Sequence, residues 1–203
     1  MDLVIENVGR RSDDWGEEGA PTDVGEASLN GYERNALYWN RGEGHFVDVG
    51  HLTGANRIED GRGVAVADFD HDGRQDLLIA NLHKPAALLM GRGDVGHWLQ
   101  ISLVGAGANP DALAATVTAR VGDRLHTRQV AAGSGYLATS SSVLHFGLGD
   151  ASSIDVLEVR WPSGRVQTLS EVAADQRLQL RESDFVALQA QLREGQPQPA
   201  EAP

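Results

Sequence analysis

The chain has 203 residues, of which 41% are hydrophobic and 23% charged, and its formal net charge is −12. The length suits one large domain or two small ones, and the acidic balance argues against nucleic-acid binding through a broad basic face. The absence of cysteine excludes disulfides and thiolate metal sites. No apolar run approaches the ~18 residues of a membrane span, and no signal peptide is visible in the sequence.

The first part of the chain divides into an irregular segment and a hairpin. Residues 1–34 show no clear period and are expected to be irregular. Residues 37–39 are strand-like, residues 40–44 carry the glycines of a hairpin turn, and residues 45–49 form the expected return strand.

Short apolar runs then recur at regular spacing. Strands are expected at 63–68, 76–81 and 87–90, flanked by turn residues. Their spacing predicts a meander of antiparallel strands, as in a propeller blade, so residues 35–95 form one expected repeat region.

A second composition begins near residue 97. Leu99, Ile101 and Leu103 alternate with polar residues and are expected to share the buried face of a strand. The pattern continues to residue 182 and predicts a small antiparallel β-sandwich at 96–182. Its further strands are expected at 114–121, 125–130, 143–148, 154–161, 166–169 and 177–180.

The C-terminal part contains the one clear helical pattern. Residues 183–195 read as a short helix with Ser183 as its N-cap. Residues 196–203 are rich in proline and glutamine and are expected to be a disordered tail. The expected fold class is therefore mainly β, with partial propeller blades, a sandwich and one C-terminal helix.

The densest chemistry lies in the loop at 68–76, between two expected strands. Four aspartates fall at the first, third, fifth and ninth positions, and Gly73 permits a sharp turn. Oxygen ligands at such spacing suit a hard divalent cation, and the flexible set favours calcium over magnesium. The expected ligands are Asp68, Asp70, Asp72, the backbone carbonyl of Arg74, and Asp76.

Two other interpretations of this loop are weaker. An EF-hand needs a bidentate glutamate at the twelfth position, where this chain has Ile79, and its flanks should be helical. A polar turn whose aspartates cap their own backbone would explain one carboxylate more easily than four. The loop is therefore expected to bind calcium on a β scaffold.

The motifs resemble two known families. Residues 68–77, with the hairpin at 37–49, resemble the calcium loop of FG-GAP (VCBS-type) repeats of integrin-like propellers. Residues 97–182 resemble the ASPIC/UnbV domain. The repeats and this domain occur together in the cartilage-acidic-protein-like family and in bacterial secreted or surface proteins. The matching pieces of the second domain are residues 97–99, 133–137, 144–149, 159–164 and 174–176.

Two departures from these families stand out. The family usually has glycines where this chain has alanine and leucine at 112–115, so that turn is expected to be remodelled. A propeller needs ~4–8 blades, and this chain holds one full repeat and part of another. It is then the end of a longer protein, or its blades pack on the sandwich, or blades of another chain complete them.

The resemblance implies a calcium-binding β module for protein or glycan recognition and adhesion, with calcium in a structural role. It implies a secreted, periplasmic or cell-surface location. An alternative is a metal-dependent enzyme or accessory protein of bacterial enediyne-type biosynthesis, although no acid–base or nucleophile set stands beside the loop. A fragment without independent function is a third possibility.

Two further motifs carry little weight. Residues 91–96 satisfy G-x-G-x-x-G, but a strand pattern follows where a dinucleotide site needs a helix. Trp98, Tyr136 and Trp161 could form a ligand platform, and a place in the core is the better interpretation.

Overall fold

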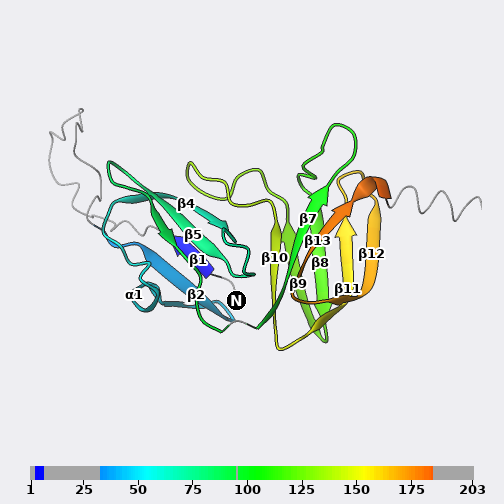
Figure 1. Ribbon diagram of the computed structural model, residues 1–203, viewed down its shortest axis with the longest axis horizontal. Coiled ribbons are helices and arrows are strands. Elements are labelled where there is room, and N and C mark those ends of the chain that lie inside the picture. Colours follow the sequence, from blue (N-terminus) through cyan, green and yellow to red (C-terminus); the bar gives the residue numbers. More distant parts are fainter. Residues whose placement is uncertain (1–2, 7–32, 95, 185–203) are drawn as a thin grey trace, which may run out of the picture. The chain divides into compact units, whose positions relative to one another are not determined.

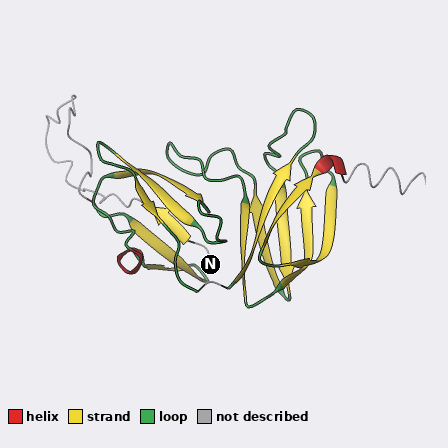
Figure 2. Ribbon diagram, in the orientation of Figure 1, coloured by secondary structure: helices red, strands yellow, loops and turns green. Residues whose placement is uncertain are grey.

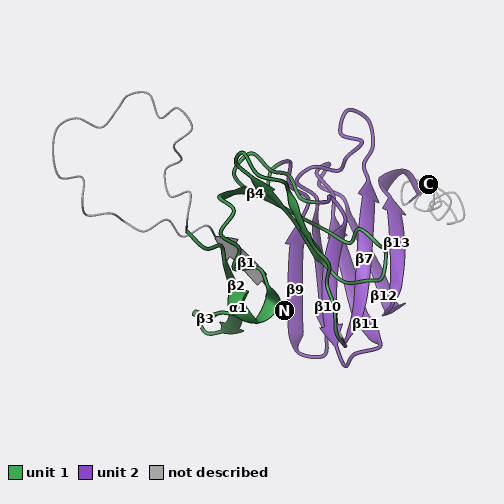
Figure 3. Ribbon diagram, turned by 60° about the vertical axis from the view of Figure 1, so that its left-hand side comes forward, with its two compact units in different colours: residues 1–93, 133–140 green, residues 94–132, 141–203 purple. Residues whose placement is uncertain are grey.

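The computed structural model describes residues 3–6, 33–94 and 96–184 (Figure 1). Strands dominate these residues, which confirms the expected mainly β class. The chain divides into two compact units (Figure 3). Unit 1 comprises Met1–Gly93 and Gly133–Ser140, and unit 2 comprises Asp94–Ala132 and Ser141–Pro203.

Unit 1 begins with an antiparallel sheet of order β1-β2-β3. The turn between β2 and β3 has the left-handed backbone that its glycines predict, with φ of 92° at Gly42 and 78° at Gly44. Its elements are β1 (Leu3–Glu6), β2 (Ala36–Gly42), β3 (His45–Asp48) and the following turn of helix α1 (Gly50–Thr53).

Strand β1 lies within the segment expected to be irregular. Its four residues are too few to show a period, and Leu3 pairs with Trp39 far along the chain. The strand is therefore set by a distant partner, which a local sequence pattern does not report.

The second sheet of unit 1 holds the acidic loop. It has the order β4-β5-β6, with β4 (Gly61–Ala67), β5 (Asp76–Asn81) and β6 (Ala87–Leu89), close to the expected strands. Leu37, Val49, Ala55 and Leu77 form a buried cluster that joins the two sheets. Burial of such side chains contributes roughly 1.5–3 kcal/mol each, so this small core fixes the strands around the loop.

Gly133–Ser140 also belongs to unit 1, although it follows the first strands of unit 2 in sequence. The segment lies along β4, because the Val66 N–H donates to Ser140 Oγ at 3.1 Å. A Cβ on Gly63 would lie 3.1 Å from the Tyr136 carbonyl oxygen. Glycine at this position therefore allows the close approach.

Unit 2 is a two-layered β structure with the sheet orders β10-β7-β13 and β12-β11-β8-β9. All but one of its pairs are antiparallel, and β13 runs parallel to β7. The parallel pair arises because β13 joins the other sheet instead of pairing with β12. Its strands are β7 (His97–Val104), β8 (Thr116–Val121), β9 (Arg124–Gln129), β10 (Leu144–Gly149), β11 (Ser153–Arg160), β12 (Val166–Ala173) and β13 (Gln176–Arg181).

The core of unit 2 lies between its sheets. Leu99, Ile101 and Leu103 are buried in it, as their alternation predicts. Phe146 and Trp161 are 1% and 2% exposed, so Trp161 is a core residue and not part of a ligand platform.

The turn at 112–115 has the left-handed backbone that glycine adopts most easily. Ala112 and Ala114 have φ of 50° and 68°, a region that costs roughly 1–2 kcal/mol for an L-residue. The turn therefore keeps a glycine-like backbone although alanines occupy its two left-handed positions.

Residues 182–184 form a helical turn after β13 (Figure 2). The remainder of the expected helix at 183–195 and the tail at 196–203 lie outside the described residues. The helices of the described residues are all too short to cross a membrane.

Candidate metal centre

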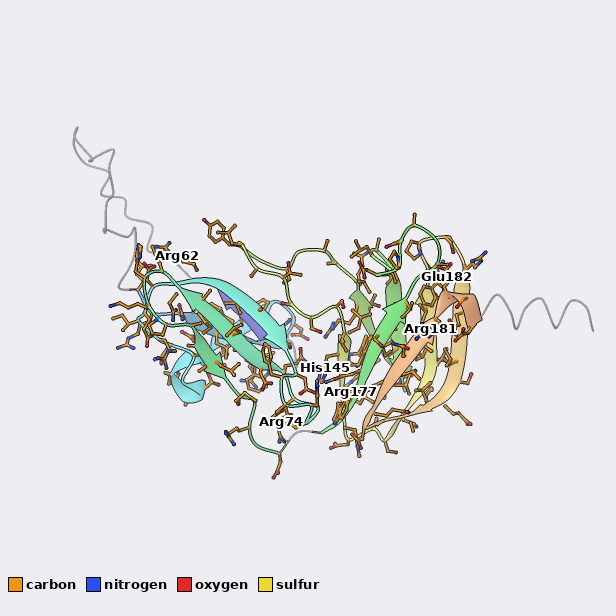
Figure 4. All side chains as sticks on the ribbon, turned by 45° about the horizontal axis from the view of Figure 1, so that its top comes forward. Arg62, Arg74, His145, Arg177, Arg181 and Glu182 are labelled. Carbon is orange, nitrogen blue, oxygen red and sulfur yellow. The ribbon has the colours of Figure 1, made fainter. Side chains whose placement is uncertain are left out.

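The acidic loop connects β4 to β5. The pairing of Ala67 with Asp76 closes the loop at its base. Arg74 in the loop and Arg62 near the start of β4 lie at opposite ends of the hairpin (Figure 4). The strands thus present the loop residues at one end of the sheet.

Three of the four predicted carboxylates converge. One oxygen each from Asp68, Asp70 and Asp76 lies within 4.8 Å of the others. Asp76 is fully buried, Asp68 is half-buried and Asp70 is exposed. The cluster is therefore open to solvent on the Asp70 side and closed on the Asp76 side.

Asp76 is fixed by the backbone. Its Oδ2 accepts a hydrogen bond from the Phe69 N–H at 2.7 Å, and its Oδ1 accepts one from the Gly91 N–H at 2.7 Å. A Cβ on Gly91 would lie 2.8 Å from the Gln75 carbonyl oxygen, so only glycine brings that N–H so close. No cationic side chain among the described residues pairs with Asp76.

The loop also coils around its first carboxylate. Asp68 accepts hydrogen bonds from the N–H groups of Asp72 at 3.1 Å and Gly73 at 2.9 Å. Left-handed backbone at His71 (φ 68°) and Gly73 (φ 88°) makes this coil possible. Gly73 therefore has the turn role that the sequence predicts.

The Asp72 carboxylate is engaged differently. Its Oδ2 accepts from Arg74 Nε at 2.8 Å and lies 2.6 Å from Arg74 Nη2, while its Oδ1 accepts from the Arg74 N–H at 2.9 Å. Arg74 Nη1 donates to the Gly93 carbonyl at 3.1 Å and so ties the loop to the chain after β6. The sequence analysis predicted a role for the Arg74 backbone carbonyl and missed the ion pair of its side chain. The one sequence signal for that pair is an arginine two residues after an aspartate.

The donor set fits a hard divalent cation. It consists of oxygens alone, which calcium and magnesium prefer. At a separation of 4.8 Å, two carboxylates repel by roughly 3 kcal/mol at an effective dielectric of 20. A cation that offsets this repulsion would be held by Asp68, Asp70 and Asp76, and the contributions of Asp72 and the Arg74 carbonyl remain predictions.

The other candidates do not form such a site. Within 33–94 and 96–184, no second trio of His, Asp or Glu side chains shows the same convergence. The glycine motif at 91–96 leads into strand β7, so the dinucleotide interpretation fails as expected. Tyr136 is 69% exposed and therefore is not the core residue that we expected.

Two family models match the chain. The FG-GAP-like repeat matches residues 23–79, and the ASPIC and UnbV model matches residues 105–186. The first match overlaps the repeat region expected at 35–95, and the second overlaps the β domain expected at 96–182.

The chain is also similar to cartilage acidic protein 1. It is 39% identical to the Xenopus tropicalis protein over 122 residues, which are 55% of this chain and 18% of the relative. The identity is 36% for both the Mus musculus and the Homo sapiens proteins, over 54% and 52% of this chain and 18% and 16% of those relatives. The chain thus spans less than a fifth of these relatives. The resemblance inferred from the motifs is confirmed: the chain joins an FG-GAP-like repeat to an ASPIC and UnbV segment.

Proposed function

We propose that the chain is a calcium-stabilised β module that recognises a protein or glycan partner outside the cytoplasm. One observation carries the calcium role: Asp68 and Asp70 converge on Asp76, which is fully buried without a cationic partner among the described residues. The recognition role and the location are supported by the matches to the FG-GAP-like and ASPIC and UnbV models.

Calcium would act as a structural ion. When bound, it supplies the positive charge that three converging carboxylates lack. Asp76 holds its place through the Phe69 and Gly91 N–H groups, so it is the fixed ligand of the set. Asp70 is exposed and is the ligand that the ion gathers. The ion thus links the exposed part of the loop, at Asp70, to the start of β5, at Asp76.

Asp72 and Arg74 complete this proposal. Their ion pair orients the second half of the loop, and Arg74 also reaches the Gly93 carbonyl. An ion that takes Asp72 as a ligand must share it with Arg74. We therefore rank Asp72 below Asp70 as a ligand.

The experiment compares thermal unfolding of the parent and Asp70→Ala, each with calcium and with a chelator. Asp70 accepts only a long hydrogen bond, 3.3 Å from the Asp72 N–H, and its charge repels those of Asp68 and Asp76, so its removal should not lower the Tm in chelator. Calcium at 100 times its Kd stabilises the parent by about 2.7 kcal/mol, and the variant should lose most of this gain.

The matched control is Asp123→Ala, which removes an aspartate from the turn between β8 and β9. It should keep the full calcium-dependent increase in Tm. An Asp70→Ala protein whose Tm rises with calcium as much as the parent's would overturn the assignment.

A further inference from the structure

Unit 2 contains a pocket of about 390 Å³ that the calcium loop does not use. It lies where the start of β7, the end of β10 and the link between β12 and β13 come together. The volume suits one side chain or a small ligand. Its lining residues are Gly96, His97, Trp98, Gly149, Asp150 and Asp175.

Asp175 is the fixed element of this pocket. Its N–H donates to the Trp98 carbonyl at 2.6 Å, its Oδ1 accepts from the Trp98 N–H at 3.2 Å, and its Oδ2 lies 2.6 Å from His97 Nδ1. These contacts hold Asp175 at a φ of 58°, a left-handed turn conformation that aspartate adopts more readily than most residues.

The pocket is negative in every protonation state of its histidine. The His97 hydrogen bond lowers the pKa of Asp175 and keeps that carboxyl ionised. Asp150 is exposed and makes no hydrogen bond or ion pair with the described residues, so no protein cation neutralises its charge. Counting Asp150, Asp175 and His97 gives −2 with a neutral imidazole and −1 with a charged one.

Trp98 adds an aromatic surface. It is partly exposed and lines the same pocket, in contrast to the buried Trp161. An indole ring and a carboxylate that line the same pocket each attract a cation, the ring through its quadrupole and the carboxylate through its charge. A planar guanidinium satisfies both at once, because it stacks on an aromatic ring and forms paired hydrogen bonds with a carboxylate.

We propose that this pocket binds the guanidinium group of an arginine side chain on a partner protein. A neutral sugar would leave the Asp150 charge without a counter-charge, so charge complementarity favours the arginine. The inference deepens the recognition role proposed above and rests on it for the statement that the partner is a protein. The pocket belongs to unit 2 and the calcium loop to unit 1, so the two sites can be tested separately.

The test is a titration of the whole chain with small probes, in which NMR monitors the backbone amide and tryptophan indole signals. The probes are Nα-acetylarginine amide, its neutral isostere Nα-acetylcitrulline amide, and a set of methyl glycosides. The arginine probe should shift the Trp98 indole signal with a Kd on the order of 1 mM. The Kd of the citrulline probe should be up to about fivefold higher than that of the arginine probe. This is the factor that a partly exposed charge pair contributes to affinity.

Asp150→Asn is the decisive variant, because it removes the charge and keeps the shape. It should weaken arginine binding severalfold and reduce the preference over citrulline, because only Asp175 then remains charged. Asp123→Asn, which lies in a distant turn, should leave both titrations unchanged. Amide spectra of each variant show whether the fold is kept.

Equal binding of arginine and citrulline, shifts away from Trp98, or saturation of the pocket by a glycoside would each overturn the inference. Calcium binding measured on the same sample separates this failure from a failure of the proposed function.

Discussion

Replacing Glu182 by glutamine removes a buried charge that ties three parts of unit 2 together. Glu182 is 3% exposed and lies at the end of β13 (Figure 4). Its Oε1 accepts hydrogen bonds from Ser163 Oγ and from Arg165 Nη1, and its Oε2 accepts one from the Ala106 N–H at 3.1 Å. One carboxylate thus joins the β11–β12 turn, the loop after β7 and the end of the last strand.

The cost of Glu182→Gln follows from these contacts. If the amide oxygen keeps Ser163 and Arg165, the amide N–H₂ group faces the Ala106 N–H, and a buried donor loses its acceptor. Such a loss costs about 1–3 kcal/mol. The Arg165 side chain is 46% exposed, so the lost ion pair adds no more than about 1 kcal/mol. The total is roughly 1–4 kcal/mol of the free energy of unfolding.

The same contacts set a pH dependence. Burial raises the pKa of Glu182, but the hydrogen bonds from Ser163 and Ala106 and the Arg165 charge outweigh burial and leave the pKa lowered. A carboxyl with a lowered pKa in the folded state stabilises the protein above its ordinary pKa of 4.5, and this stabilisation is lost as the pH falls through the folded value. The difference between the parent and Glu182→Gln should therefore shrink below about pH 4.5.

Urea unfolding at pH 7 and pH 3.5, followed by circular dichroism, measures both effects. The matched control is Glu158→Gln, a partly exposed glutamate paired with Arg160 at 2.9 Å, which should cost less than about 1 kcal/mol. A Glu182→Gln protein as stable as Glu158→Gln at pH 7 would refute the network argument.

Three further changes test other parts of the structure. Asp72→Asn should weaken calcium binding less than Asp70→Asn in calorimetric titration, because Arg74 already engages Asp72; the reverse order would contradict our ranking. Gly63→Val should displace the Tyr136 carbonyl, because a Cβ at position 63 would lie 3.1 Å from that oxygen. Chymotrypsin should then cleave after Tyr136 severalfold faster than in the parent. Ala114→Gly should stabilise unit 2 by up to about 1 kcal/mol in urea unfolding, because relief at φ 68° exceeds the glycine entropy cost, and a clear loss would count against strain.

Most strands could be predicted because each carries its own signal. The alternation at Leu99, Ile101 and Leu103 identifies both β7 and its buried face. The same signal says nothing of which strand lies beside which, so the parallel pairing of β13 with β7 was not expected. Strand β1 was missed for a related reason, since its pairing with β2 depends on a distant segment.

The candidate site shows the same division. Regular aspartate spacing predicts the loop, and the structure brings Asp68, Asp70 and Asp76 together. The pairing of Asp72 with Arg74 depends on side-chain conformation, which spacing does not specify. The His97–Asp175 pair joins residues 78 positions apart, so only the folded sheet reveals it.

Calcium titration of the parent protein by calorimetry tests the central claim most directly. We expect one calcium ion per chain with a Kd of roughly 10⁻⁴–10⁻³ M, the range of extracellular calcium modules. The Tm should rise with calcium and return to its starting value with excess chelator. An absence of binding heat up to about 10 mM calcium, together with equal Tm values in calcium and chelator, would contradict the account.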